Sequence, residues 1–234
     1  MYIRLSASTA KQITEEFMIL TINSKIIMPK PNTWADGAIQ PPAPPEPPEP
    51  TPVLPEYTIR LKFRDGVTPS ISRGTLTQVS AEPNIWDFTL SNANWSYIFQ
   101  RQEITEVIAA NIVGVTDLSY AFYYCGSLEK INVFDISTVT TINYMCVSCG
   151  SLKTVPLFNT ANLIKMYSAF NSCSAVESGM LALYQQASSQ ANPPQQYMNA
   201  FTDCGKDRFG RYSSESARLE RAQIPTTWGG DMEV

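Results

Sequence analysis

The sequence contains no histidine, which removes the commonest general base and the commonest metal ligand of proteins. It also has no surplus of positive charge, with 17 basic against 21 acidic residues and a net charge of −4. Nothing in this balance favours nucleic acid or an anionic membrane as a partner. Any catalysis would depend on carboxylates, lysines or cysteines. The sequence therefore favours a protein that is not an enzyme and that holds no cofactor and no metal.

Long apolar runs are also missing. The most apolar early stretch, residues 17–28, is interrupted by Asn23, Ser24 and Lys25, and it is too short to cross a bilayer of about 30 Å as a helix. Residues 1–12 lack the basic start and the apolar centre of a secretory signal. We therefore expect no membrane insertion and no standard export.

Proline is unevenly distributed, because nine of the 17 prolines fall between Pro41 and Pro55. Proline fixes φ and cannot donate a ladder hydrogen bond, so residues 40–56 predict a polyproline II linker of roughly 50 Å, at about 3.1 Å per residue. A linker of this kind holds one domain at a distance from another. A ligand for proline-reading domains is the alternative interpretation.

The linker follows a short segment, residues 1–39, whose alternating and β-branched runs predict a small β-rich module. About forty residues rarely hold a stable core alone. We therefore expect this module to dock on copies of itself or on a larger assembly. The alternative is a strand-rich lid packed on the rest of the chain.

After the linker, residues 57–92 predict a small sheet. Residues 57–64 alternate apolar and polar side chains and precede a turn at Asp65-Gly66. Further strands are expected at residues 76–79 and 85–90. The nearby aromatic residues are expected to cover the open end of the following domain; they are Trp86, Phe88, Trp95 and Phe99.

Residues 93–234 contain a repeat with a period of 24, the spacing from Leu118 to Ile142 and from Ile142 to Met166. Leu118, Phe122 and Cys125 are spaced as one stripe of a short helix, which Thr116 or Asp117 could cap. Residues 128–133 and 152–157 match L-x-x-L-x-L, the strand portion of a leucine-rich repeat. The sequence thus predicts an α/β solenoid, a short leucine-rich-repeat stack whose units each contain a strand and a short helix. Residues 178–190 predict a longer helix before Pro193-Pro194; this helix interrupts the array and begins the C-terminal cap.

The blocks that begin at Val115 and Val139 resemble a known family. Both follow the pattern V-T-x-x-x-x-x-x-x-x-C-x-S-L, which is similar to the BspA-like leucine-rich repeat of bacterial surface proteins. The similarity covers residues 104–205, and the flanks around residues 84–87 and 178–187 resemble repeat proteins encoded by phages and prophages of gut bacteria. Cys146 departs from the usual Phe or Met. The resemblance implies adhesion or surface recognition and carries over no catalytic residue.

Four of the five cysteines occupy the same repeat position, so the repeat itself explains them. Cys146-x-x-Cys149 resembles half of a zinc site or a redox motif, but no second pair and no histidine complete it. We expect free, buried thiols. Paired carboxylates such as Glu103 with Glu106, or Glu215 with Glu220, are interpreted as solvated surface.

Two surfaces of the expected stack are candidate binding sites. On the strand face, side chains between the inward-facing ones form a ladder of Glu129, Lys130, Asn132, Lys153 and Thr154. On the helical side, tyrosines offer contact area at little entropic cost, namely Tyr120, Tyr123, Tyr124, Tyr144 and Tyr167. The alternative is that these tyrosines only shield the repeats.

Together these features predict a non-enzymatic phage virion surface protein, a capsid fibre or decoration or a tail adhesin. Residues 1–39 would bind other virion proteins, and the repeat head would bind a host-surface glycan or protein. We expect a homo-oligomer or a part of a large assembly, at the virion surface and without nucleic acid as a partner. A bacterial leucine-rich-repeat scaffold, or a surface adhesin exported by an unrecognised route, is the alternative.

Overall fold

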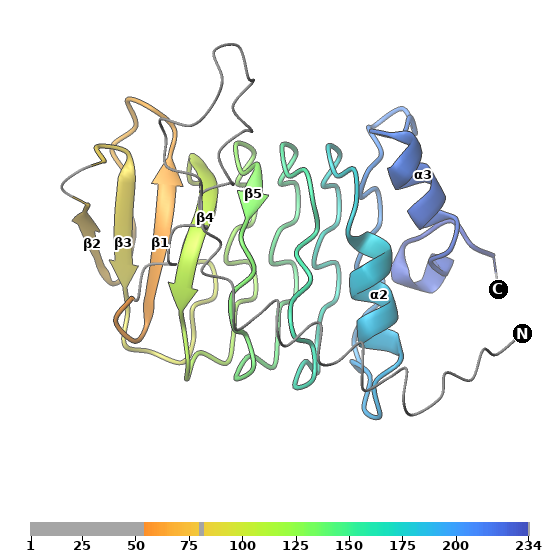
Figure 1. Cartoon of the computed structure of the whole chain (residues 1–234), viewed down its shortest axis with the longest axis horizontal. Coiled ribbons are helices and arrows are strands. Elements are labelled where there is room, and N and C mark those ends of the chain that lie inside the picture. The colour runs from red at the N-terminus through yellow and green to blue at the C-terminus, as the bar shows by residue number, and fades with distance from the viewer. Residues whose placement is uncertain (1–53, 80–81, 234) are drawn as a thin grey trace, which may run out of the picture. The chain divides into compact units, whose positions relative to one another are not determined.

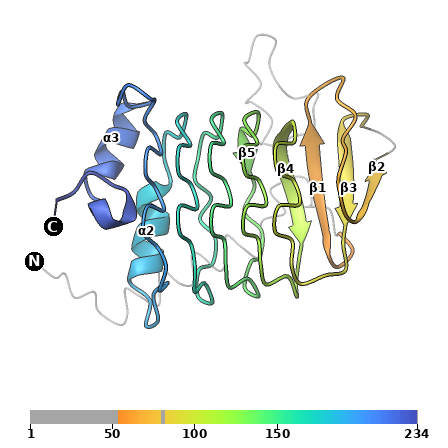
Figure 2. The same cartoon turned by 180° about the vertical axis from the view of Figure 1, so that it is seen from behind.

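A computed structural model describes residues 54–79 and 82–233. The predicted module at 1–39 and most of the predicted linker at 40–56 lie outside these residues. The described part is a sheet at one end, a series of turn-rich coils in the middle, and two helices at the other end (Figure 1). The same order of parts is seen from behind in Figure 2.

The sheet has five strands in the order β2-β3-β1-β4-β5. They are β1 (Thr58–Phe63), β2 (Thr75–Gln78), β3 (Ile85–Thr89), β4 (Ile104–Asn111) and β5 (Lys130–Ile131). The first four pair antiparallel, whereas β4 and β5 pair in parallel. The three strands expected between residues 57 and 92 are confirmed as β1, β2 and β3.

The predicted α/β solenoid, with a strand and a short helix in each unit, is wrong. The described residues form a mixed five-stranded sheet, and the α-helices among them are two short C-terminal ones. These are α2 (Met180–Ser188), which confirms the helix expected over residues 178–190, and α3 (Glu215–Arg221). A 3-10 helix, η2, spans Thr226–Trp228.

Consecutive turns replace the helices expected in the repeats. In residues 118–125 the amides of Ala121 and Cys125 bond to carbonyls three residues earlier, and Tyr120 and Tyr124 have φ values of 59° and 60°. The carboxylate of Asp117 accepts a bond from the amide of Ser119 at 2.7 Å, which closes a local turn and caps no helix. The apolar spacing fits either a helix or a series of turns, so periodicity alone did not distinguish them.

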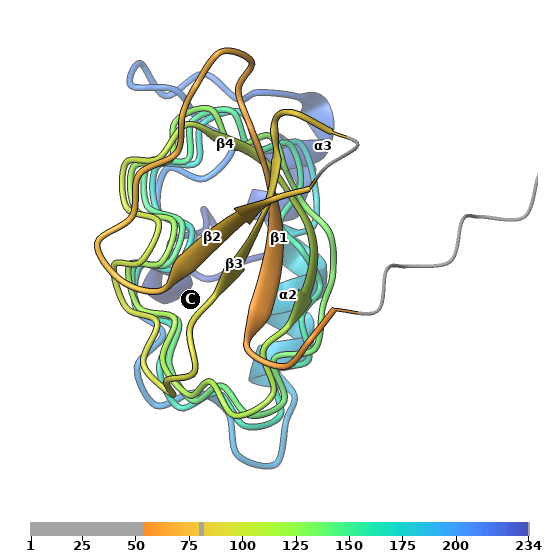
Figure 3. The same cartoon turned by 90° about the vertical axis from the view of Figure 1, so that its left-hand side faces the viewer.

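These turns stack on one another in register. Parallel bridges join Asn94 to Asp117, Asp117 to Thr141, Thr141 to Lys165, and Lys165 to Gln196. Amides of one coil donate to carbonyls of the next, for example Tyr120 N to Asn143 O at 2.9 Å. We call the five segments the turn stack; they are residues 94–101, 117–124, 141–148, 165–172 and 196–203. Viewed from the sheet end, successive coils lie almost behind one another (Figure 3).

The strand expected in each repeat is also shorter than predicted. Residues 128–133 contribute only the two residues of β5, and residues 152–157 contribute a single bridge between Thr154 and Ser178. Pro156 has no amide hydrogen, so the ladder stops there. Val133 and Leu157, which the pattern placed inward, are 63% and 47% exposed.

A continuous apolar core joins the sheet to the turn stack. Phe88 of β3 meets Trp95 and Phe99 edge to face, with ring centroids 5.1 and 4.9 Å apart. Phe99 then stacks on Phe122 of the next coil at 5.3 Å. Phe88 thus covers the first coil, as expected from the sequence, whereas Trp95 and Phe99 belong to that coil and Trp86 is only partly buried.

Candidate functional site

The strand-face residues predicted from the sequence come together in one groove. Residues 129–133 and 153–157, with Gly179, line a groove of about 640 Å³, which we call the strand groove. Lys130 pairs with Glu106 at 3.0 Å, and Lys153 lies 3.9 Å from Glu177. The side-chain Nδ2 of Asn132 donates to Ile108 O at 2.9 Å. Thr154 and the exposed Glu129 also line it.

The floor of the strand groove is mainly apolar, because Val133 and Leu157 are exposed within it. Gly179 has a φ of 93°, and a Cβ there would come 2.2 Å from the carbonyl oxygen of Val155. Glycine is therefore required at this point. The groove has the composition of a shallow protein contact surface with charged side chains at its edge.

The predicted tyrosines form a row on the turn stack, which is a face of turns and not of helices. Tyr120 stacks on Tyr97 at 4.3 Å and on Tyr144 at 4.6 Å, and Tyr144 lies 5.2 Å from Tyr167. Tyr97 was not predicted, because the recognised repeats began at residue 104 and did not include the coil at residues 94–101.

The remaining two tyrosines of the prediction extend this row sideways. Tyr123 lies 5.4 Å from Tyr120 and 4.5 Å from Tyr124, between ring centroids. The guanidinium of Arg101 lies over the ring of Tyr124 at 5.7 Å, a distance typical of a cation–π contact.

The stacking determines what the row offers to a ligand. Neighbouring rings cover one another's faces, so the ring edges and hydroxyls are what the middle of the row presents. Burial, and then the neighbouring phenols, raise the pKa of Tyr120 to about 12. Burial likewise raises the pKa values of Tyr123 and Tyr144. The phenols therefore remain neutral donors and acceptors of hydrogen bonds at ordinary pH.

A third surface was missed by the sequence analysis. Two adjoining hollows, of about 520 and 390 Å³, share Thr140 and Ile164; together we call them the polar trough. Hydroxyl and amide side chains line both, and Asp117 and Lys165 lie in the smaller one. The signal was present in the repeat, since polar residues recur just before the tyrosines, as in Ser119-Tyr120 and Asn143-Tyr144.

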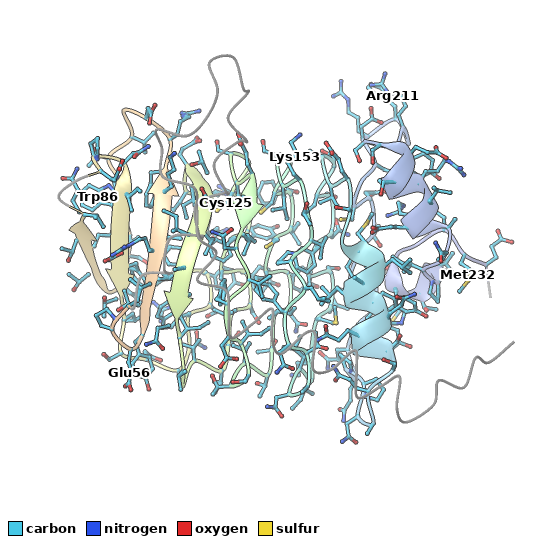
Figure 4. All side chains as sticks on the ribbon, viewed as in Figure 1. Glu56, Trp86, Cys125, Lys153, Arg211 and Met232 are labelled. Atoms are coloured by element: carbon cyan, nitrogen blue, oxygen red, sulfur yellow. The ribbon has the colours of Figure 1, made fainter. Side chains whose placement is uncertain are left out.

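The cysteines lie inside the stack and confirm the expectation of free, buried thiols. The thiols of Cys125, Cys149 and Cys173 donate to carbonyls of the preceding coil, at 2.9 to 3.1 Å. Burial raises the pKa of Cys125 to about 12 and that of Cys149 well above its ordinary value. Figure 4 labels Cys125 within the stack and Lys153 at its edge.

The paired carboxylates each have a structural partner. Glu103 accepts a bond from the hydroxyl of Ser127, Glu106 pairs with Lys130, and Glu215 pairs with Arg218. Glu220 binds the amides of Gly179 and Leu181, both at 3.1 Å. In residues 54–79 and 82–233, no three metal-binding side chains lie close enough to hold an ion. None of the helices in that part is long and apolar enough to span a membrane.

Comparisons with protein-family models, with curated proteins and with solved structures found no match to this chain.

Proposed function

We propose that this chain is a non-enzymatic surface protein of a phage virion, as a capsid fibre, a capsid decoration or a tail adhesin. Residues 1–39 attach it to other virion proteins, and the proline-rich segment separates the attachment from the head. The head, residues 57–234, binds the host surface. The observation that carries the binding role is the regular register of outward side chains on the turn stack, where equivalent positions recur on adjacent coils.

Binding is favoured over catalysis because the side chains considered for catalysis, the thiols and the paired carboxylates, are either buried or bonded to structural partners. The thiols are buried inside the stack, where burial keeps Cys125 protonated. Glu220 caps a helix, and Glu106 is paired with a lysine. What remains at the surface is a set of shallow hollows lined by polar and aromatic side chains, which suits recognition of an extended ligand.

The virion assignment comes from the sequence. The repeat blocks at Val115 and Val139 resemble BspA-like surface repeats, and their flanks resemble phage-encoded proteins. Residues 1–39 are too few for a stable core of their own, which favours attachment to a larger assembly. Both points support the proposal independently of the described surfaces.

The test is incorporation into particles. Purified virions from a lysogen that carries this gene would be analysed by mass spectrometry, beside virions that carry a version lacking residues 1–39. We expect the full chain in particles and the shortened chain only in the soluble lysate. Circular dichroism of the shortened chain should show a folded head.

A matched control removes residues 44–50 from the proline-rich segment, which shortens the linker and leaves the attachment intact. This version should still be incorporated. The full chain found on the bacterial cell and never in particles would contradict the virion role and would identify a bacterial surface adhesin. Loss of the folded head on removal of residues 1–39 would contradict the separation of attachment from binding.

A further inference from the structure

The polar trough has the features of a ligand site that the sequence did not predict. It runs over three adjacent coils, from Asp117 past Thr141 to Lys165, which are joined by parallel bridges. Since neighbouring strands are about 4.8 Å apart, its width is roughly 10 Å. The second hollow continues it past Thr140 toward Gln195. A ligand that fills it must be extended.

The trough presents hydrogen-bonding groups that the described residues do not use. The carbonyl oxygen of the Asn143 side chain holds the amide of Tyr167 at 2.8 Å, which orients the amide nitrogen. That nitrogen and the ammonium of Lys165 have no hydrogen-bond or ion-pair partner within residues 54–79 and 82–233. Gln195, which is exposed, adds another amide. The trough therefore offers donors from Asn143 and Lys165, and both a donor and an acceptor from Gln195.

The acceptor at the other end is held in place. One oxygen of Asp117 accepts from the amide of Ser119 at 2.7 Å, and the other from the side chain of Asn94 at 3.2 Å. Asp117 carries a negative charge and Lys165 a positive one, so the charges in the trough balance. This balance favours a neutral ligand over a strongly acidic or basic one.

An apolar side chain lies where the two hollows meet. Ile164 is 44% exposed and lines both. An exposed apolar surface between polar groups matches a ligand that has hydroxyls at its rim and C–H groups on its face. Sugar rings have this character. The phenol edges of Tyr120 and Tyr144 follow directly along the chain and offer further hydroxyls.

The strand groove differs from the polar trough in its lining, and this difference indicates which class of ligand each surface would bind. It is lined by exposed Val133 and Leu157, and its lysines face Glu106 and Glu177. An apolar floor favours protein side chains, whereas the trough mixes hydroxyls and amides with apolar side chains such as Ile164 and Pro193, a combination that favours a polyhydroxylated ligand with apolar ring faces. We propose that the polar trough binds a neutral linear oligosaccharide, with Ile164 against a sugar face and Asn143 and Lys165 bonded to its hydroxyls.

This inference rests on the proposed role in host-surface binding and names the ligand class. The test uses the full chain, fluorescently labelled, on a dense array of linear oligosaccharides of four or more units, with neutral and uronic-acid-containing members. A dense array is needed because a shallow site binds weakly and gains from multivalency. We expect binding to at least one neutral oligosaccharide.

Two trough variants, Ile164→Ala and Lys165→Ala, should each weaken array binding at least tenfold. Both side chains are exposed, so the fold should be unaffected, and circular dichroism checks this. The matched controls are Leu157→Ala and Lys153→Ala, which remove similar exposed side chains from the strand groove. They should leave binding to the oligosaccharide array unchanged.

Binding to whole host cells separates the two proposals. Cell binding that is lost in the strand-groove variants and kept in the trough variants would overturn the oligosaccharide site while leaving the adhesin role. Array binding confined to acidic members would overturn the neutral class. Array binding that persists in both trough variants would overturn the location. Failure to bind either cells or array would contradict the host-binding role itself.

Discussion

Arg221 is the one buried charged residue in the part of the chain that the structure describes. Its guanidinium pairs with Asp231 at 2.9 Å and donates to the carbonyls of Phe201, Cys204 and Gly229 at 2.7 to 2.9 Å. Partial burial acts to raise the pKa of Asp231, but hydrogen bonds from Arg221 and Lys206 outweigh it and lower this pKa to about 2. The pair thus ties the last coil to the C-terminal segment.

The first prediction concerns this pair. Arg221→Met should lower the free energy of unfolding by about 3 kcal/mol, because Asp231 keeps only Lys206 and Tyr212 as partners and the carbonyls of Cys204 and Gly229 lose their side-chain donor. Urea denaturation at pH 7 measures the change. The control Arg218→Met removes an exposed arginine that contacts only Glu215 and should cost less than about 1 kcal/mol. Equal losses in the two variants would contradict the role of the buried pair.

The second prediction concerns backbone strain. Ser148 has a φ of 59°, a region that costs a non-glycine residue about 1 to 2 kcal/mol, whereas glycine adopts it freely. Ser148→Gly should therefore raise the free energy of unfolding by about 0.5 to 1 kcal/mol. Ser151, in the same coil, does not have a positive φ, so Ser151→Gly should lower it. Thermal unfolding distinguishes the two, and destabilisation by both changes would show that the strain is unimportant.

The third prediction concerns the thiols at alkaline pH. Burial raises the pKa of Cys125 from 9.0 to about 12, so the unfolded chain loses this proton first. Below pH 9 the contribution to stability is fully present, and it is lost as the pH rises from 9 toward 12, at about 1.4 kcal/mol per pH unit. In Cys125→Ala the stability should fall less steeply between pH 9 and 11. Denaturation series at several pH values measure the two slopes, which should be equal if the thiol does not contribute.

At the scale of elements, α2 interrupts the regular stack. The interval from Lys165 to Gln196 is 31 residues, against 24 from Thr141 to Lys165, and α2 lies within the additional chain. Gly179, which precedes the helix, provides no side-chain cap. The carboxylate of Glu220, from α3, acts as the N-terminal cap of α2 by accepting hydrogen bonds from the amides of Gly179 and Leu181. Two helices far apart in the sequence are joined by this bond.

The fourth prediction tests that bond. Glu220→Ala should lower the free energy of unfolding by about 1 kcal/mol, since it removes both a cap and a negative charge at a helix N-terminus. Glu215→Ala removes an exposed carboxylate from the first turn of α3, where the helix dipole and Arg218 also favour it, and should lower the free energy of unfolding by less than about half as much. Chemical denaturation of both variants provides the comparison, and a Glu215 effect as large as that of Glu220 would refute the capping role.

The elements that the sequence predicted correctly are those whose pattern has one solution. Strict alternation gave β1, and the stripe of Met180 and Leu183 gave α2. The repeats failed because Leu118, Phe122 and Cys125 satisfy both a helix and a turn series. What decides between them is where the amides bond, and the amide of Phe122 bonds to Met145 of the next coil. A pattern within one repeat cannot contain that information.

The candidate surfaces likewise include one that the sequence predicted and one that it did not. The residues of the strand groove were predicted, because the period places them one above another. The polar trough was missed, although its smaller hollow repeats at residues 117, 141 and 165 and follows from the period. Its larger hollow includes Gln195, which follows the longer interval that contains α2, and only the spatial return of residues 192–196 beside Ile164 makes that hollow apparent.

At the scale of the whole head, the last coil is covered by the C-terminal segment. The amide of Phe201 donates to Trp228 O at 2.8 Å, and the ring of Trp228 stacks on Tyr197 at 4.3 Å. At the other end, β3 and its Phe88 cover the first coil. Both ends of the stack are thus closed by elements that differ from the repeat.

The fifth prediction tests the C-terminal closure. A chain that ends at Gly205 loses the partners of the last coil, so we expect it to expose apolar surface and self-associate. Size-exclusion chromatography measures this. The control Phe209→Ser removes a side chain that is 67% exposed in the removed segment and should leave the protein monodisperse or in its native assembly. A truncated chain that elutes like the control would show that the segment is dispensable.

The register of the turn stack has a consequence for how such a head changes in evolution. Adjacent coils are joined by main-chain bonds that every residue except proline can make, so a duplicated block of 24 codons can enter the stack without altering its neighbours. Each duplication would lengthen the outer face by one spacing and add one more set of contacts. Longer inserts can leave the stack between two coils, as the segment that carries α2 does, and reshape one edge while the rest stays constant. The length of the stack and the shape of one edge can therefore change separately in this architecture.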